Sequence, residues 1–354
     1  MNMLVRARAE LVALKPYASA RRSGFEARIR LDANESPWSG DDTLAAALNR
    51  YPDPQPQRLR ERLAALYATT PRRLWIGRGS DEAIDLLLRA FCMAGRDNVV
   101  APAPTFGMYR IGATLQGAQF RALTLDAENG FALDADALLA LVDDDTKLVF
   151  ACSPNNPTGT LYHAQLDALA SALAGRALLV VDEAYIEFAD APSAITLLDR
   201  HANLAVLRTL SKAHGLAGAR VGALIAREEI VDLVARIAAP YPLPVPSASA
   251  ALAALDDDVL ARTRERVATL VRERERLREA LSTLACVDRV WPSSGNFLLA
   301  RFADAKVAFA RLLDAGILVR DFSAQAGLAH CLRISIGLPE QNDAVIAALA
   351  GSRP

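Results

Sequence analysis

Seven short runs of apolar residues recur along the first two thirds of the chain, and most of them are separated by segments of helix length. We predict strands at residues 74–77, 98–101, 119–123, 147–151, 177–181, 204–208 and 221–226. Helices are expected between them, for example over residues 81–93 and 163–173. Apolar strands that alternate with helices are typical of a mostly parallel sheet covered on both faces. The sequence therefore predicts a large α/β domain with a seven-stranded sheet over residues 45–240.

The remaining residues are enough for a second, smaller domain, since 354 residues exceed one ordinary core. Four prolines within residues 237–255 exclude a membrane helix there and favour an extended connector. A long helix is expected over residues 259–284, bridging two domains rather than forming a coiled coil. Strands at 296–301, 317–320 and 332–336 should alternate with helices at 305–315 and 340–350. We assign residues 241–354 to the connector, the bridging helix and a small α/β domain.

Residues 1–44 are expected to form an N-terminal arm and part of the small domain, with a short strand at 28–31. A short helix is expected at 42–49. The first ten residues carry charges where a signal peptide would have its apolar core, which predicts a cytoplasmic protein.

Charge and cysteine usage narrow the possible functions. The chain has 40 basic and 41 acidic residues, a formal net charge of −1, and so gives no electrostatic reason to expect nucleic acid or a membrane as partner. Its four cysteines and four histidines show no metal-ligand spacing. We therefore expect reduced thiols, no metal site and a small-molecule substrate.

Residues 209–222 hold one lysine, Lys212, and one arginine, Arg220, among small and apolar residues. Few neighbours could hydrate the lysine, and desolvation makes an amine a better nucleophile. The arginine offers a planar fork for a phosphate or a carboxylate. Taken alone, this stretch is equally consistent with a solvated surface loop.

Polar residues also follow the other predicted strands, and ligands collect beyond the carboxyl ends of such strands. Asn156 lies in a turn after residues 147–151, and Asp182 and Tyr185 follow residues 177–181. Gly79 leads a turn into a helix at Ser80, Asp81 and Glu82, where free backbone N–H groups suit a phosphate, although Ser80 or Asp81 could simply cap the helix.

One cofactor, pyridoxal phosphate, needs this set of groups together. Lys212 would supply an amine for its aldehyde, and Asp182 an anion that keeps its pyridine nitrogen protonated. Tyr185 and Asn156 would hold its ring oxygen. The phosphate would be bound by Ser211, Arg220 and the turn formed by Ser80, Asp81 and Glu82.

At this point the chain resembles the fold type I pyridoxal-phosphate aminotransferases along nearly its whole length. The resemblance rests on Asn-Pro-Thr-Gly at 156–159, Asp-Glu-Ala-Tyr at 182–185 and Ser-Lys-x-x-Gly-Leu-Ala-Gly-x-Arg at 211–220. Further segments are similar to the histidinol-phosphate aminotransferase family in particular, at residues 31–37, 51–54, 79–82, 104–109, 182–188 and 332–337.

The resemblance implies roles for individual residues. Lys212 would be the Schiff-base lysine and proton shuttle, with Asp182 and Tyr185 as its catalytic partners, and Phe106 would lie against the cofactor ring. Tyr51 would reach the phosphate site of a neighbouring subunit, which implies a homodimer with composite active sites. Substrate contacts are implied for a further set, of which Arg333 would clamp a carboxylate or phosphate: Arg333, Arg320, Tyr17, Asn34 and Asn296.

The implied reaction exchanges an amino group between L-histidinol phosphate and 2-oxoglutarate, giving imidazole acetol phosphate and glutamate in histidine biosynthesis. An aromatic or broad-specificity aminotransferase, or an amino-acid-phosphate decarboxylase of the same fold, would share nearly all of these motifs. A transcription regulator built on an aminotransferase domain would need an added DNA-binding domain, and the roughly 30 residues before Asp32 are too few for one.

Overall fold

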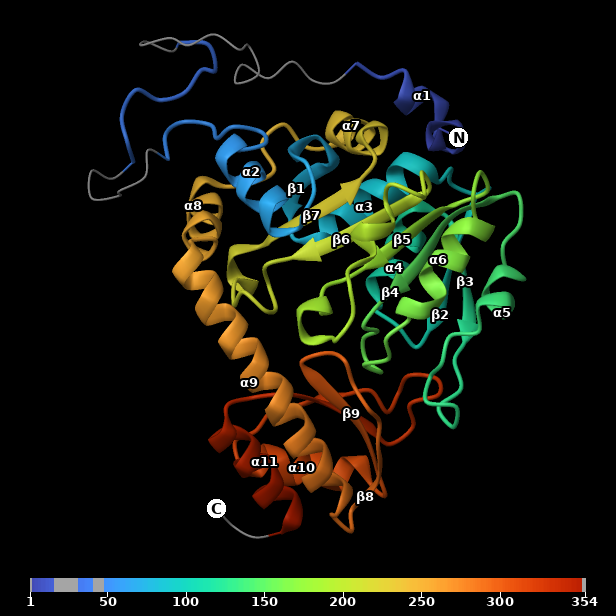
Figure 1. Cartoon of the computed structure of the whole chain (residues 1–354), viewed down its shortest axis with the longest axis vertical. Coiled ribbons are helices and arrows are strands. Elements are labelled where there is room, and N and C mark those ends of the chain that lie inside the picture. The colour runs from blue at the N-terminus through green and yellow to red at the C-terminus, as the bar shows by residue number, and fades with distance from the viewer. Residues whose placement is uncertain (1, 16–30, 41–47, 352–354) are drawn as a thin grey trace.

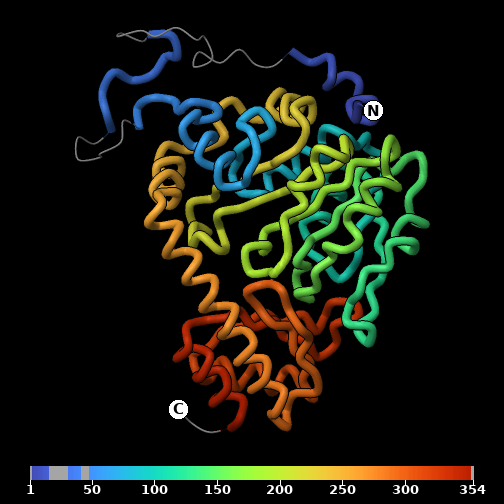
Figure 2. The backbone as a smooth tube through the Cα atoms, in the orientation of Figure 1, coloured from blue at the N-terminus to red at the C-terminus, as the bar shows by residue number. Residues whose placement is uncertain are grey.

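The computed structural model describes residues 2–15, 31–40 and 48–351. The two sheets lie in separate parts of the molecule, and the long helix α9 (Asp257–Ser282) runs from the larger part to the smaller one (Figure 1). Figure 2 follows the same path from the first residues, beside the larger part, to the C-terminal residues at the far end of the smaller part. The expected strand at 28–31 and helix at 42–49 lie largely outside the described residues.

The larger sheet has seven strands in the order β1-β7-β6-β5-β4-β2-β3, and all seven were predicted from apolar runs. Their bounds are β1 Leu74–Arg78, β2 Asn98–Ala103, β3 Gln119–Thr124, β4 Thr146–Cys152, β5 Leu178–Asp182, β6 Leu204–Thr209 and β7 Val221–Ala226. Strands β6 and β5, β5 and β4, β4 and β2, and β2 and β3 pair in parallel. Only β7 runs the other way, antiparallel to both β1 and β6. The expected mostly parallel, seven-stranded sheet is therefore confirmed.

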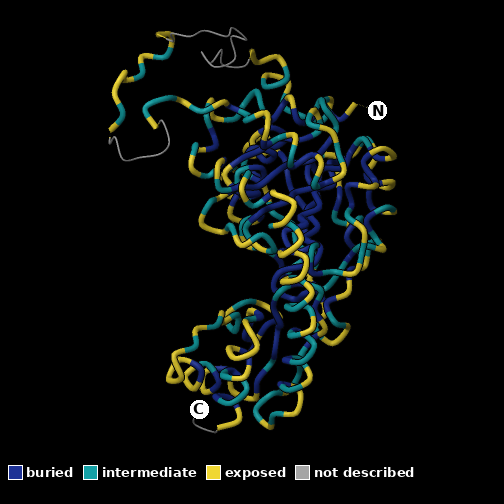
Figure 3. Tube along the Cα trace, turned by 60° about the vertical axis from the view of Figure 1, so that its left-hand side comes forward, coloured by how far each residue is buried: buried dark blue, intermediate teal, exposed yellow. Residues whose placement is uncertain are grey.

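Helices cover both faces of this sheet because successive residues of each buried strand point to opposite sides. In β5, Leu179 and Val181 pack into one core cluster, whereas Leu178 and Val180 pack into the other. One face is covered by α2 Gln57–Leu66, α5 Ala135–Leu139, α6 His163–Ala172 and α8 Val245–Ala254. The other is covered by α3 Ser80–Phe91, α4 Met108–Gln116 and α7 Glu228–Ile237. Most fully buried residues lie in this larger part (Figure 3).

The smaller sheet has the order β10-β11-β9-β8 and is antiparallel throughout. Its strands are β8 Val287–Val290, β9 Phe297–Phe302, β10 Arg320–Asp321 and β11 Cys331–Ser335, packed against α9, α10 Ala305–Asp314 and α11 Pro339–Ala350. Strand β8 was not expected, since its four residues place two charged residues between two valines and are too few to stand out. Arg274 of α9 donates to the backbone oxygens of Phe188 and Gly295 at 3.1 and 3.0 Å, and so joins the two parts.

Three expectations differ from the structure. Of the strand expected at 317–320, only Arg320 lies in a strand, β10. The segment predicted as an extended connector is wrong over its second half, where α8 begins at Val245 with Pro246 in its first turn. A proline is tolerated there because the first N–H groups of a helix have no partner within it. The described N-terminal residues form η1 Met3–Arg6 and α1 Ala9–Val12, and Met3 packs with α3 and α7 of the larger part rather than with the small sheet.

Within the described residues, no helix is both long enough and apolar enough to cross a membrane.

Candidate active site

Polar side chains from five strands meet at one edge of the larger sheet. The carboxyl ends of β1, β4, β5 and β6 lie at this edge, and so does the start of β7, because β7 runs antiparallel. This explains why Arg220, which precedes a strand, joins groups that follow strands. The groups surround a cavity of about 130 Å³, lined by Ser80, Asp81, Phe106, Cys152, Asn156, Asp182, Ala184, Tyr185, Thr209, Ser211, Lys212, Ala217 and Arg220.

Asp182 is the last residue of β5 and is only 2% exposed. Its Oδ1 accepts a hydrogen bond from the backbone N–H of Ala184 at 3.1 Å, and its Oδ2 accepts one from the Tyr109 hydroxyl at 2.8 Å. Burial raises the pKa of Asp182 to about 6, against the lowering effect of these two donors. A carboxylate in such a dry site is stabilised by a cation that binds next to it.

Lys212 lies three residues after the end of β6, with its Nζ 5.4 Å from the centre of the Tyr185 ring. Lys212 as a whole residue is exposed, although its amine is partly buried. Partial burial and then the nearby Arg333 guanidinium lower the pKa of the Lys212 amine. A lowered pKa increases the unprotonated, nucleophilic fraction of an amine at neutral pH.

Asn156 and Tyr185 form the wall beside Lys212, and both are largely buried. The Asn156 Nδ2 donates to the Tyr185 hydroxyl at 3.4 Å, and the Asn156 Oδ1 accepts a hydrogen bond from Arg333. Burial raises the pKa of Tyr185, so its hydroxyl keeps its proton at neutral pH and can donate it to a ligand oxygen.

The opposite end of this cavity is suited to an anion. Helix α3 begins at Ser80 without a side-chain cap, so its first N–H groups can donate to a ligand. A Cβ added at Gly222 would lie 2.3 Å from the Ser80 backbone nitrogen, so only glycine allows β7 to pass this close to the helix start. The Arg220 guanidinium contacts Asp81 Oδ2 at 2.9 Å and Ser211 Oγ at 3.3 Å. The Asp81 carboxylate is negative and contacts Arg220, so Asp81 could bind an anion only through its backbone N–H.

A second, wider cavity of about 590 Å³ continues from the first, since Phe106, Asn156, Tyr185 and Lys212 line both. Its outer wall comes from the small sheet and the segment between β10 and β11: Arg320, Asp321, Phe322, Ala324, Gln325 and Arg333. Arg320 and Arg333 are direct cross-strand partners. Like charges placed opposite each other are unfavourable by themselves, and an anion between them removes the repulsion.

Several residues assigned from the sequence do not line these cavities. Glu82 turns toward Arg78, whose guanidinium lies 2.6 Å from Glu82 Oε1. Tyr51 is half-exposed and stacks on Tyr241, with ring centres 4.4 Å apart. Asn34 is exposed in the described N-terminal segment, and Asn296 contributes its backbone oxygen to Ile336. Tyr17 lies outside the described residues.

Other residues of the site were not assigned a role from the sequence. Tyr109, Cys152 and Thr209 lie in or beside the first cavity, and Phe322 and Gln325 line the second. Cys152 and Thr209 are the last residues of β4 and β6, so the rule that ligands collect at strand ends could have found them. Tyr109 lies in the first turn of α4 and carries no such signal.

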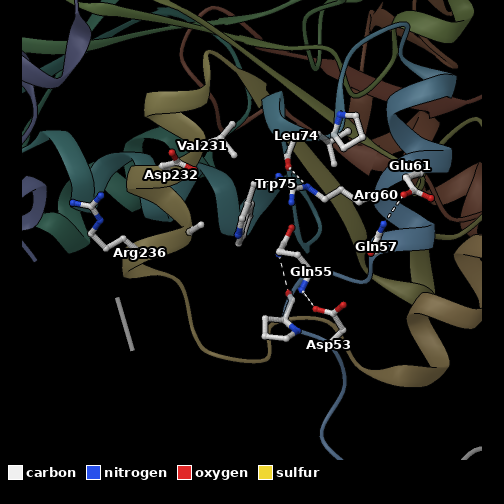
Figure 4. A pocket seen from close by; sticks show the side chains of 13 residues that line it. Asp53, Gln55, Gln57, Arg60, Glu61, Leu74, Trp75, Val231, Asp232 and Arg236 are labelled. Atoms are coloured by element: carbon white, nitrogen blue, oxygen red, sulfur yellow. Dashed lines mark hydrogen bonds between the residues drawn. The ribbon is translucent and has the colours of Figure 1, made fainter. Parts of the chain in front are cut away.

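A further cavity, of about 600 Å³, lies between α2, β1 and α7, away from the groups described above (Figure 4). Several of its polar side chains have partners within the protein. The Gln55 side chain donates to the backbone oxygen of Ile76 and accepts a hydrogen bond from the backbone N–H of Ile76. Arg60 Nε donates to the backbone oxygen of Leu74. Gln57 donates to Glu61. We assign no chemistry to this cavity.

In the part of the chain that the structure describes, no group of three or more histidine, cysteine, aspartate or glutamate residues could hold a metal ion.

Comparison with known proteins assigns the chain to a family. The family of class I and II aminotransferases matches residues 38–349. The chain belongs to this family. This aminotransferase is 53% identical to the histidinol-phosphate aminotransferase of Stenotrophomonas maltophilia (strain R551-3) over 355 residues. The match covers 99% of this chain and 98% of the relative.

Solved structures agree with this assignment. The histidinol-phosphate aminotransferase of Sinorhizobium meliloti, in complex with pyridoxal-5'-phosphate, is 28% identical, with a TM-score of 0.79 over 87% of this chain and 84% of that one. A decarboxylase from Sulfurospirillum multivorans is 25% identical, with a TM-score of 0.75 over 83% and 85% of the two chains. The predicted membership of the fold type I aminotransferases is therefore confirmed.

Proposed function

We propose that this aminotransferase binds pyridoxal phosphate and exchanges an amino group between L-histidinol phosphate and 2-oxoglutarate, as a step of histidine biosynthesis. The observation that carries the proposal is that one cavity holds a buried carboxylate, Asp182, and an amine of lowered pKa, Lys212. The name and near-complete overlap of the 53% identical relative support the choice of substrate.

The residues present fit the cofactor. Asp182 is buried, negative at neutral pH and lacks a cationic hydrogen-bond partner among the described residues, which suits a pyridinium nitrogen. Tyr185 and Asn156 would hold the ring oxygen, and Phe106 would lie against the ring. The uncapped start of α3, Ser211 and Arg220 would hold the phosphate. Lys212 would hold the aldehyde carbon.

When bound, the cofactor supplies a sink for the electrons left on the substrate Cα after its proton is removed. Asp182 would keep the ring nitrogen protonated, which that role requires. Lys212 Nζ would take the proton from the substrate Cα and return it elsewhere. Its lowered pKa increases the fraction of the amine that can accept a proton.

The second cavity would select the substrates. Arg333 and Arg320 present two guanidinium groups to it, and two such forks suit a phosphate dianion or a carboxylate. The same pair would therefore serve histidinol phosphate in one half-reaction and 2-oxoglutarate in the other. Asn34, Asn296 and Tyr17 remain predicted substrate contacts.

We further propose a homodimer in which Tyr51 contacts the phosphate site of a second copy, and a cytoplasmic location. Tyr51 lines neither cavity of its own chain and is half-exposed, which is consistent with a role toward a partner.

The proposal is tested by adding histidinol phosphate to the purified, cofactor-loaded protein and following its visible absorption. The cofactor band should disappear with histidinol phosphate and return with 2-oxoglutarate, with one glutamate formed per cycle. Phenylalanine and tyrosine serve as competing substrates, and equal rates with them would favour a broad-specificity enzyme. Release of carbon dioxide from an amino-acid phosphate, without glutamate, would instead indicate a decarboxylase.

A further inference from the structure

We propose that Tyr109 is a positioning residue, whose hydroxyl fixes the Asp182 carboxylate in the orientation and charge state that the cofactor's ring nitrogen requires. The inference rests on the proposed function and adds to it a residue that does not itself touch the cofactor. Tyr109 lies in the first turn of α4, far from Asp182 in sequence, and its side chain is completely buried.

The contact is direct and isolated from water. The Tyr109 hydroxyl donates to Asp182 Oδ2 at 2.8 Å, and the two residues are 0% and 2% exposed. The only other donor that bonds to this carboxylate among the described residues is the Ala184 N–H, on Oδ1. One donor on each oxygen fixes the plane of the carboxylate, while leaving further lone pairs for a ligand.

The fold explains why a helix residue meets the end of β5. Alternation along β5 places Val180 in the core beneath α3, α4 and α7, so Asp182, two residues on, points to the same side. There Tyr109 stacks on Phe150 of β4, with ring centres 4.6 Å apart and planes 7° apart. This stacking fixes the ring, so the hydroxyl has a defined position.

Tyr109 also supports the residue expected to lie against the cofactor ring. Its ring packs edge-on against Phe106, with centres 5.7 Å apart. Phe106 lines both cavities. Tyr109 therefore supports two residues of the proposed cofactor site, Asp182 by a hydrogen bond and Phe106 by packing.

The hydroxyl stabilises the charged form of Asp182. Burial penalises that charge, and the hydrogen bond from Tyr109 is the first influence that opposes burial and lowers the pKa of Asp182. The other titratable groups that influence or are influenced by Asp182 are Cys152 at the end of β4, Asp81 at the start of α3, Tyr185 and Lys212. Without the hydroxyl, a larger fraction of Asp182 would carry a proton, and this fraction would grow as the pH falls.

The test is the affinity of the full-length apoprotein for pyridoxal phosphate, measured by equilibrium titration from pH 6 to pH 8.5. Tyr109→Phe keeps the stacked ring and removes only the hydroxyl. We expect its Kd at pH 7 to be about tenfold higher than that of the unchanged protein, as for the loss of one hydrogen bond to a charged group. The ratio of the two Kd values should rise as the pH falls.

Tyr162→Phe is the matched control. Tyr162 is also almost fully buried, and its hydroxyl has no hydrogen-bond partner among the described residues. Its loss should leave the cofactor affinity and its pH dependence unchanged. Because all proteins are titrated with the same cofactor, ionisation of the cofactor itself cancels in the ratios.

A double-mutant cycle separates positioning from a general structural role. If Tyr109 acts through Asp182, Tyr109→Phe should have little further effect in the Asp182→Asn background. Fully additive losses, a pH-independent loss, an unchanged Kd or a Tyr109→Phe protein that fails to fold would each overturn the assignment. If the unchanged protein and Tyr162→Phe both fail to bind pyridoxal phosphate, the proposed function itself is wrong, and the inference falls with it.

Discussion

The two walls of the active site are built in opposite ways. The wall at the end of β5 holds a single buried carboxylate, Asp182, fixed by two donors within the protein. The wall on the small sheet holds two guanidinium groups, Arg320 and Arg333, that face a wider cavity. The carboxylate must keep its charge without water, whereas the guanidinium groups are always charged and can remain partly solvated.

This difference separates two tasks. A fixed, buried charge can tune the electronic state of one cofactor that stays in place. Arginines in a wide cavity can instead accept several anions in turn, because a guanidinium binds carboxylate and phosphate with the same fork. Lys212 lines both cavities and is therefore the point at which the two tasks meet.

Removing Lys212 should have the largest effect, because Lys212 lines both cavities. We expect Lys212→Ala to lower the rate of amino transfer by at least ~10⁴-fold, since it removes the residue that we propose as both nucleophile and proton acceptor. The variant should also retain no cofactor covalently after borohydride reduction, as checked by mass spectrometry.

Lys306→Ala is the control for this prediction, because Lys306 is an exposed lysine on α10 and lines neither cavity. It should remain fully active. Covalent retention of the cofactor by Lys212→Ala would show that another amine forms the bond.

The two arginines of the small sheet should differ from each other. Arg333 contacts Asn156 as well as the cavity, so Arg333→Met should lower kcat/KM for both substrates by about 100-fold. Arg320 lines the second cavity but has no such contact with Asn156. We therefore expect Arg320→Met to lower kcat/KM about tenfold, mainly through a higher KM.

Steady-state kinetics with each substrate would check this order. Arg311→Met, on an exposed part of α10, is the control and should change neither constant. Equal effects of the two cavity variants would contradict a special role for the contact between Arg333 and Asn156.

The smallest effect concerns the stability of the apoprotein. The pKa of Asp182 is about 6 in the folded protein, against an ordinary 3.8. As the pH rises, Asp182 therefore loses its proton in the unfolded chain before it does so in the folded protein. The free energy of unfolding decreases between pH 4 and pH 6 for this reason, and the decrease is complete above about pH 6. Between pH 5 and pH 7 this contribution should lower the free energy of unfolding by about 1 kcal/mol.

Urea unfolding of the apoprotein at several pH values, compared with Asp182→Asn, isolates this contribution. The variant cannot titrate at this position, so its stability relative to the unchanged protein should increase by that amount as the pH rises. A difference that stays constant with pH would mean that Asp182 is not desolvated.

Local sequence patterns were sufficient for most of the elements. The seven strands of the larger sheet are nearly continuous apolar runs, so their positions follow from burial on both faces. The same reasoning failed at Pro246, where four alternating prolines suggested extended chain although the last of them lies in the first turn of α8. It also missed β8, whose edge position and four residues leave little periodicity to detect.

The groups expected at the large-sheet edge were mostly predictable for the same reason. Asn156, Asp182, Ser211 and Lys212 follow strands that run in one direction, and the first cavity contains all four. Glu82 was predicted to bind the phosphate because it follows Ser80 and Asp81 in sequence. It is the third residue of α3, and its side chain points toward Arg78 instead.

The sequence by itself determined which residues carry charge and reactivity and which strands bring them to one edge, because these depend on side-chain chemistry and on short-range periodicity. Only the tertiary structure decided that β7 runs antiparallel and brings Arg220 to that edge, and that Arg320 lies opposite Arg333. It also placed the Tyr109 hydroxyl on Asp182, across 73 residues of chain. Such contacts depend on how distant elements pack against each other, and no local pattern of residues records that packing.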